Sequence, residues 1–296
     1  MSEITADKLN QTDRQTDRQT DRQTDRQTDR QTDRQTVNLL FTGGWDSTFR
    51  LLQLSEYPII VQPIYIVEYF RASAKHEQRT MKKIIEAIRK LDGCNTLIQD
   101  PIVYDGEWVL KNCADAEISD AFRYVANKYQ IGAQYHYFAL LGKYFDMKME
   151  CGLESGGGRS KAENAINGGC ELTPLGDDFL PGRLIILPKG DSRNEYLVFK
   201  DLILSIIDLT KIQEGEIAEQ KGWSEIMKMT WFCSHPIFGK PCGICAPCTD
   251  AMNEGMEWRM PKISQWRYRN YNRLYPIAKR LYLLKNRVVR KILDCM

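Results

Sequence analysis

From Val37 onward, the spacing of apolar and polar positions predicts strands that alternate with helices. Residues 37–41 form a short apolar run typical of a buried strand, and the apolar positions within 49–54 then begin a helix. A β-type run covers 59–67, although Pro63 interrupts it, and apolar residues at helical spacing follow over 81–91. Strand–helix repeats of this kind indicate a parallel sheet with helices packed on it.

The pattern continues through the middle of the chain. Further apolar runs at 96–103, 148–152 and 183–188 predict strands, and 121–145 is helix-like. We expect a helix that starts at Lys200 and runs into the apolar segment 201–209. The fold class is therefore α/β, with helices on both faces of the sheet. In such open sheets ligands bind beyond the carboxyl ends of the strands.

Composition changes abruptly along the chain and suggests four segments. Residues 11–34 are six copies of Gln-Thr-Asp-Arg without an apolar residue, so we expect 1–36 to be a disordered repeat tail. The remaining segments are an α/β domain at 37–230, a cysteine-rich lobe at 231–260 and a basic helical tail at 261–296. With 296 residues and 43% hydrophobic content, a wholly disordered chain is excluded.

The repeat also suggests a hypothesis about the gene. The four-base unit ACAG, read in triplets, encodes Thr-Asp-Arg-Gln, so slippage of such a tract would explain the perfect period. Gain or loss of one unit would shift the reading frame. We therefore hypothesise that expression is phase-variable, against the simpler interpretation of a passive linker. Synonymous codons mixed among the repeats would exclude slippage.

A glycine-rich loop between the first predicted strand and helix has the chemistry of a phosphate site. Its seven residues are Thr42, Gly43, Gly44, Trp45, Asp46, Ser47 and Thr48. Glycines allow close approach of backbone N–H groups, the hydroxyls add donors, and the amino end of a helix favours an anion. Asp46 could orient the loop or help hold Mg²⁺. A tight strand-to-helix connection without a ligand is the alternative.

A second glycine-rich stretch runs over 152–160 and continues at 167–169. We expect it to be mobile, either as a lid over a nucleotide or as a surface excursion. Glu154 and Arg159 are its residues with chemistry to offer.

Four cysteines fall within sixteen residues, at Cys233, Cys242, Cys245 and Cys248. The spacing Cys-x8-Cys-x2-Cys-x2-Cys suits a tetrahedral Zn²⁺ site, and four thiolates leave no open position, so the predicted role of the metal is structural. An iron–sulfur cluster or thiol chemistry are the alternatives.

The loop 42–48 resembles the SGGxDS loop of the PP-loop ATP pyrophosphatases, with Thr42 in place of the usual Ser. The resemblance implies a Rossmann-like sheet of the adenine nucleotide alpha hydrolase type, with ATP and Mg²⁺ as cofactors. The Phe-Lys-Asp sequence at 199–201 is similar to that of glutamine-dependent GMP synthetases, which implies that Lys200 reaches the phosphates. Asp46 and Lys200 are therefore the candidate catalytic residues.

With its cysteine spacing, the chain resembles the 7-cyano-7-deazaguanine synthases of queuosine biosynthesis over about residues 37–252. That resemblance implies an ATP-dependent ligase that adenylates a small-molecule carboxylate and transfers ammonia to it. The family's Tyr-Ser-Gly-Tyr-Pro-Asp-Cys-Arg substrate segment is replaced here by a glycine-rich, acidic stretch at 154–178. A diverged paralogue with another substrate fits this departure. A PP-loop tRNA sulfurtransferase and a non-catalytic nucleotide-binding protein are the alternatives.

Charge is distributed unevenly along the chain. The net charge is +2, but 262–296 holds ten basic residues and one acid, a local charge of +9. Interleaved aromatics and a helical apolar pattern suit packing on the body of the protein or on a second subunit, an anionic membrane surface, or a nucleic acid. A homodimer is thus among the expected partners. No apolar run long enough for a membrane span or signal peptide is present, and we expect a cytoplasmic protein.

Overall fold

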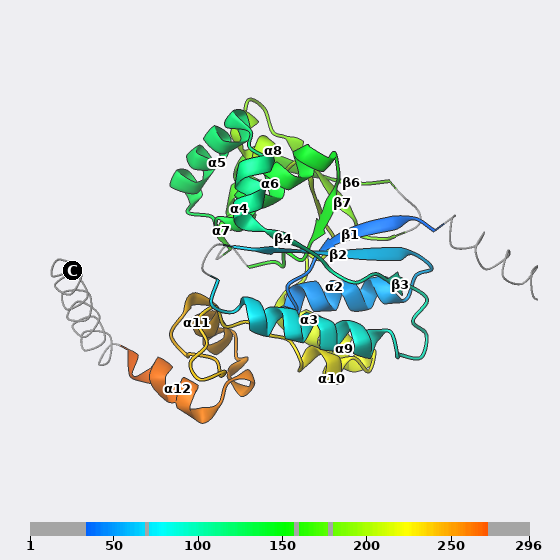
Figure 1. The fold of residues 1–296 in the computed structure, drawn as a ribbon, viewed down its shortest axis with the longest axis vertical. Coiled ribbons are helices and arrows are strands. Elements are labelled where there is room, and N and C mark those ends of the chain that lie inside the picture. The colour runs from blue at the N-terminus through cyan, green and yellow to red at the C-terminus, as the bar shows by residue number, and fades with distance from the viewer. Residues whose placement is uncertain (1–33, 69–70, 157–159, 177–179, 272–296) are drawn as a thin grey trace, which may run out of the picture.

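The computed structural model describes residues 34–68, 71–156, 160–176 and 180–271, and Figure 1 shows their arrangement. Most of the repeat tail 1–36 and of the basic tail 261–296 lies outside the described residues, as do Tyr69–Phe70 and Arg159. Thr36 already belongs to the first strand, so this strand begins one residue earlier than predicted.

Eight strands form one mixed sheet in the order β3-β2-β1-β5-β8-β7-β6, with β4 paired to β2 next to β3. The strands are β1 (Thr36–Leu40), β2 (Ile60–Val67), β3 (Leu97–Ile98), β4 (Ile102–Asp105), β5 (Met149–Cys151), β6 (Cys170–Pro174), β7 (Leu184–Pro188) and β8 (Leu202–Leu204). All pairs from β3 and β4 to β8 are parallel. Strand β7 runs antiparallel to both β6 and β8, so the expected parallel sheet is correct except at this edge.

Helices cover both faces of the sheet, as predicted (Figure 1). One face carries α4 (Gly106–Asn112), α5 (Ala116–Tyr129), α6 (Gln134–Phe145), α7 (Lys161–Gly169) and α8 (Arg193–Phe199). The other carries α2 (Trp45–Ser55), α3 (Ala74–Ile88), α9 (Lys211–Gln220) and α10 (Ser224–Met227). Each set of helices encloses its own hydrophobic core against the sheet.

The period-two pattern of β1 shows how the sequence divides these cores. Leu39 and Phe41 are fully buried on the α2 side, and Leu40 points into the core on the α5–α6 side. Successive side chains of a strand point to opposite faces. A central strand buried on both faces therefore gives the mainly apolar run at 37–41, in which Asn38 is the one polar residue.

Three predicted elements differ from the structure, in addition to the helix expected from Lys200, which is described with the site below. The run 96–103 is two strands, because Gln99–Pro101 interrupt the pairing between β3 and β4. The helix-like stretch 121–145 is divided between α5 and α6, where Gln130 adopts a left-handed conformation with φ of 59°. The expected loop at 167–169 is the last turn of α7. Short apolar runs do not distinguish one element from two.

A buried cluster of ion pairs connects α2 to the sheet. Glu150 of β5 is 1% exposed and accepts hydrogen bonds from Arg50 of α2 at 2.6 Å and from Ser205 at 3.2 Å. Arg183 pairs with the second carboxylate oxygen at 2.8 Å. Removing one partner would leave a buried charge uncompensated, so this cluster fixes the helix that follows the glycine-rich loop.

The last described residues form a small lobe beside the carboxyl end of β1. It contains α11 (Ala246–Asn253), the short 3-10 helix η1 (Glu257–Arg259) and α12 (Lys262–Arg269). Ala251 and Met256 join the core on the α2 face, so the lobe packs on the α/β domain. Throughout the described part of the chain, every helix is too short or too polar to cross a bilayer.

Candidate functional site

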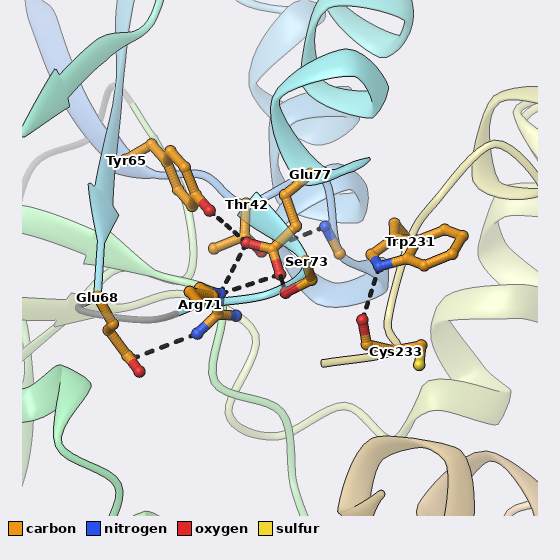
Figure 2. Close-up of polar contacts among 9 residues, drawn as sticks. Thr42, Tyr65, Glu68, Arg71, Ser73, Glu77, Trp231 and Cys233 are labelled. Atoms are coloured by element: carbon orange, nitrogen blue, oxygen red, sulfur yellow. Dashed lines mark hydrogen bonds and ion pairs between the residues drawn. The ribbon is translucent and has the colours of Figure 1, made fainter. Parts of the chain in front are cut away.

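The predicted loop 42–48 comprises the turn that follows β1, at 42–44, and the first turn of α2, at 45–48. Gly43 has φ of +70°, a conformation that favours glycine, and a Cβ on it would lie 3.2 Å from the backbone nitrogen of Met81. The Gly44 N–H donates to Thr42 Oγ1 at 3.3 Å, which tightens the turn (Figure 2). Gly44 is the N-cap of α2 and brings no capping side chain. The first turn of α2 thus has the open amino end on which anions bind.

The exit from β5 passes directly against this helix end. A Cβ on Gly152 would come 2.8 Å from the Ser47 backbone nitrogen and 3.0 Å from the Asp46 carbonyl carbon. Only a residue without a side chain fits there without displacing backbone. The sheet order reverses between β1 and β5, since β2 lies on one side of β1 and β5 on the other. Ligands of open α/β sheets bind at such a switch point.

A cavity of about 320 Å³ opens beside the loop. Its lining residues are Thr42, Gly44, Trp45, Asp46, Arg71, Glu77, Gln134, Lys211, Trp231, Phe232, Pro247, Asp250, Ala251, Glu254, Met256 and Arg259. The α/β domain supplies one wall and the C-terminal lobe supplies the other. Aromatic rings and several charged groups converge on one space, as is usual for small-molecule sites. A larger cavity of about 490 Å³ between α3 and β4 contains none of the predicted site residues.

Asp46 and Lys211 face this cavity from α2 and α9. Lys211 Nζ lies 2.5 Å from Glu154 Oε1 and 3.2 Å from Glu254 Oε2. Burial opposes the charged form of Lys211, but the carboxylates of Asp46, Glu154 and Glu254 outweigh it and raise its pKa. Burial raises the pKa of Asp46, and the charges of Lys211 and Arg259 oppose that rise. Among the described residues, no hydrogen-bond donor reaches Asp46 Oδ1.

Glu214, one turn after Lys211 on α9, is fully buried. Neither of its carboxylate oxygens has a hydrogen-bond partner in the part of the chain that the structure describes. Burial, together with the negative charges of Asp46 and Glu154, raises its pKa to about 10. Burial, followed by the negative charge of Asp46, raises the pKa of Glu154 to about 7. Glu214 therefore carries a proton at neutral pH, which lowers the negative charge near Asp46.

A second polar network holds Arg71 at the cavity wall (Figure 2). The buried Glu77 of α3 accepts hydrogen bonds from Tyr65 at 2.5 Å, Ser73 at 2.7 Å and Arg71 Nε at 2.9 Å. Arg71 also pairs with Glu68 at 3.3 Å. Burial, followed by the adjacent Glu77 carboxylate, raises the pKa of Tyr65. The Arg71 guanidinium is therefore fixed in place, and the carboxylates of Glu77 and Glu68 compensate its charge.

The four predicted cysteines converge in the lobe. The Sγ atoms of Cys233, Cys242, Cys245 and Cys248 all lie within 4.8 Å of one another. Two sulfur pairs, Cys242–Cys248 and Cys233–Cys245, are 3.9 Å apart. Four thiolates about 2.3 Å from a tetrahedral Zn²⁺ would be separated by about 3.8 Å. The cluster could therefore bind a metal such as zinc.

Backbone groups support the cysteine cluster. The N–H groups of Cys242 and Cys245 donate to the sulfurs of Cys233 and Cys242 at 3.1 and 3.3 Å. Gly243 has φ of +82°, and a Cβ there would lie 2.1 Å from the carbonyl oxygen of Ser264 in α12. The turn between the second and third cysteines consequently requires glycine, and it packs against the next helix.

The lobe and the glycine-rich loop are joined by a direct backbone contact. The Trp231 N–H donates to the Gly43 carbonyl at 2.9 Å. The Trp231 indole donates in turn to the Cys233 carbonyl at 2.8 Å, as Figure 2 shows, and its ring stacks on His76 with centroids 4.7 Å apart. One residue thus links the loop, the cysteine cluster and the amino-terminal part of α3.

Lys200 is not near the loop. It follows the last residue of α8, and the segment after it forms β8 rather than the predicted helix. Its carbonyl accepts a hydrogen bond from Lys148 Nζ at the amino ends of β5 and β8. The loop 42–48 lies at the opposite edge, beyond the carboxyl end of β1. The three residues of β8 are all buried between β5 and β7, and this pairing overrides the helical pattern.

Lys211 and Arg259 are two cations of the cavity wall that were not among the predicted site residues. A signal for Lys211 was present, because Thr210 and Gln213 form a capping box that begins α9. A lysine in the first helical turn opposes the dipole, which favours a functional reason for it. Arg259 has no such signal, because its place depends on how the lobe folds back over the loop.

Comparison with known proteins adds no further assignment: the chain matches no protein-family model, and no curated protein matches it.

Proposed function

We propose that the chain is an ATP-dependent ligase of the PP-loop type, which adenylates a carboxylate and transfers ammonia to it. The observation that carries this proposal is the loop 42–48, which meets the open amino end of α2 at a cavity lined by Asp46 and Lys211. The sheet order, with its switch point between β1 and β5, supports a Rossmann-like sheet of the adenine nucleotide alpha hydrolase type.

The proposed reaction has two bond exchanges. An acceptor carboxylate oxygen attacks the α-phosphorus of ATP, the bond to the bridging oxygen of the β-phosphate breaks, and pyrophosphate leaves with the electron pair. Ammonia then attacks the acyl carbon and loses a proton, and AMP leaves with the carbon–oxygen electron pair. Adenylation is needed because the oxygen of a free carboxylate is a poor leaving group.

Different residues of the site would bind the phosphates, stabilise the leaving group and hold the metal ion. The N–H groups of the first turn of α2 would bind phosphate oxygens. Ser47 and Thr48 are buried and do not line the cavity, so their hydroxyls take no part in this proposal. Lys211 takes the role first given to Lys200 and would stabilise the pyrophosphate as it leaves. Asp46 would hold Mg²⁺, which when bound reduces the negative charge of the phosphates. Charge stabilisation on the leaving group is the main catalytic contribution expected here.

The cysteine cluster would hold Zn²⁺ in a structural role. Four thiolates occupy every position of a tetrahedral ion, so the metal keeps no position for a reactant. Its contribution would be to fix the lobe that forms one wall of the cavity.

The acceptor proposed for the first test is 7-carboxy-7-deazaguanine. Purified protein is incubated with Mg-ATP, ammonium and this acid, and mass spectrometry measures AMP and the nitrile, which a second activation of the amide would give. AMP with nitrile establishes synthase activity. AMP without nitrile retains the adenylation chemistry and directs the search to other carboxylates.

Two outcomes would favour the alternatives. Iron and labile sulfide in the purified protein would favour a PP-loop tRNA sulfurtransferase. ATP binding without AMP formation, with every acceptor tried, would favour a non-catalytic nucleotide-binding protein.

A further inference from the structure

Arg259 is held between two aromatic rings at the cavity wall. Its guanidinium carbon lies 5.0 Å from the centroid of the Trp45 ring and 4.5 Å from that of Phe232. Nη2 donates to Thr230 Oγ1 at 2.7 Å and to the Thr230 carbonyl at 3.3 Å. Stacking and these bonds fix the plane of the guanidinium before any ligand is bound.

The charge of Arg259 is not compensated in the way that the other two cavity cations are. Arg71 pairs with Glu77 and Glu68, and Lys211 pairs with Glu154 and Glu254. Across the described residues, no carboxylate forms an ion pair with Arg259, and its hydrogen bonds go only to Thr230. Asp46 and Glu254 act on it only at longer range.

A partly buried guanidinium without a carboxylate partner costs free energy unless a ligand supplies the opposite charge. Burial lowers the pKa of Arg259 to about 10, which reports the penalty of holding its charge away from water. A planar guanidinium matches the two oxygens of a phosphate or carboxylate group, and a pair of charge-assisted hydrogen bonds would offset that penalty. Nε and Nη1 are the donors left for such a ligand.

We propose that Arg259 recognises an oxyanion of the ligand, from the side of the cavity formed by the C-terminal lobe. The inference rests on the proposed function in taking this cavity as the ligand site. The oxyanion belongs either to the phosphates of the nucleotide or to the carboxylate of the acceptor. Ligands that carry only one of these groups separate the two sources.

The test measures ligand binding rather than turnover. Isothermal titration calorimetry on the full chain compares inorganic pyrophosphate, Mg-ATP, adenosine, 7-carboxy-7-deazaguanine and the corresponding amide. We expect Arg259→Gln to weaken binding of the phosphate ligands, or of the carboxylate but not the amide, by about tenfold to a hundredfold. Adenosine binding should not change.

Two further variants keep the test decisive. Arg269→Gln makes the same change of charge at an exposed position outside the cavity and should bind every ligand as the unchanged protein does. Arg259→Lys keeps the positive charge but loses the planar guanidinium. It replaces Arg259→Gln in the test if that variant loses its bound metal or no longer unfolds cooperatively. It should weaken the same ligands.

The inference is overturned if Arg259→Gln binds all oxyanion ligands as tightly as the unchanged protein, or if the unchanged protein binds none of them. Failure of the proposed function is a different result: oxyanion binding would depend on Arg259, yet no carboxylate would be converted to an adenylate.

Discussion

Lys211 Nζ lies 2.5 Å from Glu154 Oε1, so an ion pair joins the first turn of α9 to the segment that leaves β5. The two residues are 57 positions apart and come together only because β5 and the loop before α9 end at the same edge of the sheet. The cation therefore lies at the switch point beside Asp46, where the sequence analysis had expected Lys200.

Replacing Lys211 should impair catalysis far more than replacing Lys200. We expect Lys211→Gln to lower kcat/KM for pyrophosphate release by about a hundredfold or more, since one positive charge at the leaving group is lost. Lys200→Gln, at the opposite edge of the sheet, is the matched control and should remain within about twofold of the unchanged protein. Equal losses in the two variants would restore the original assignment.

Asp46→Ala should abolish ATP cleavage while leaving the fold intact. Asp46 faces the cavity, and among the described residues its Oδ1 accepts no hydrogen bond that the substitution would break. Pyrophosphate release measures the first effect, and circular dichroism with metal content measures the second. Unchanged turnover would remove the loop from the active site.

Glu214→Gln should change how stability depends on pH. The pKa of Glu214 is about 10 in the folded protein, against an ordinary value of 4.5. Between these values the folded chain binds one more proton than the unfolded chain, so this group makes stability fall as pH rises. The slope from one such group reaches about 1.4 kcal/mol per pH unit. Glutamine has the shape of the protonated acid and does not titrate.

Urea unfolding of both proteins at pH 5 and pH 8 measures this difference. The variant and the unchanged protein should be nearly equal at pH 5, and the variant should be more stable at pH 8. Parallel stability curves would mean that Glu214 is ionised in the folded state and has a counter-ion.

Cys245→Ser should lose metal and stability together. A tetrahedral site cannot keep its affinity with one thiolate removed, and metal binding contributes directly to folding. We expect the free energy of unfolding to fall by at least about 3 kcal/mol. Cys94→Ser, outside the cluster, is the control and should keep one equivalent of metal by elemental analysis.

Gly152→Ala should destabilise the site without touching a charged group. The added Cβ would meet the Ser47 backbone nitrogen at 2.8 Å, so either β5 or the end of α2 must move, at a cost of about 1–3 kcal/mol. Gly132→Ala is the control, because its nearest neighbour would be a flexible glutamine side chain at 3.9 Å. Thermal unfolding of both variants compares the two costs.

The elements that carry a regular pattern could be predicted from the sequence, and the contacts between distant segments could not. The strand at 37–41, the helix after it and the cysteine spacing each depend on neighbours a few positions away. The helix predicted from Lys200 was wrong because the local pattern fits a helix start, while the pairing of β8 between β5 and β7 decides the structure of this segment. Arg259 reaches the cavity through tertiary packing alone.

The hydrogen bond from Trp231 to Gly43 connects the segment that leads into the cysteine cluster to the glycine-rich loop. If metal binding orders the lobe, and the lobe completes the cavity, then the two binding equilibria are linked. Linkage is reciprocal, so a ligand in the cavity must tighten metal binding by the same factor by which the metal tightens the ligand. When metal is limiting, the cysteine cluster would lose its metal first in protein molecules whose cavity is empty. A ligand bound in the cavity would help the cluster to retain its metal.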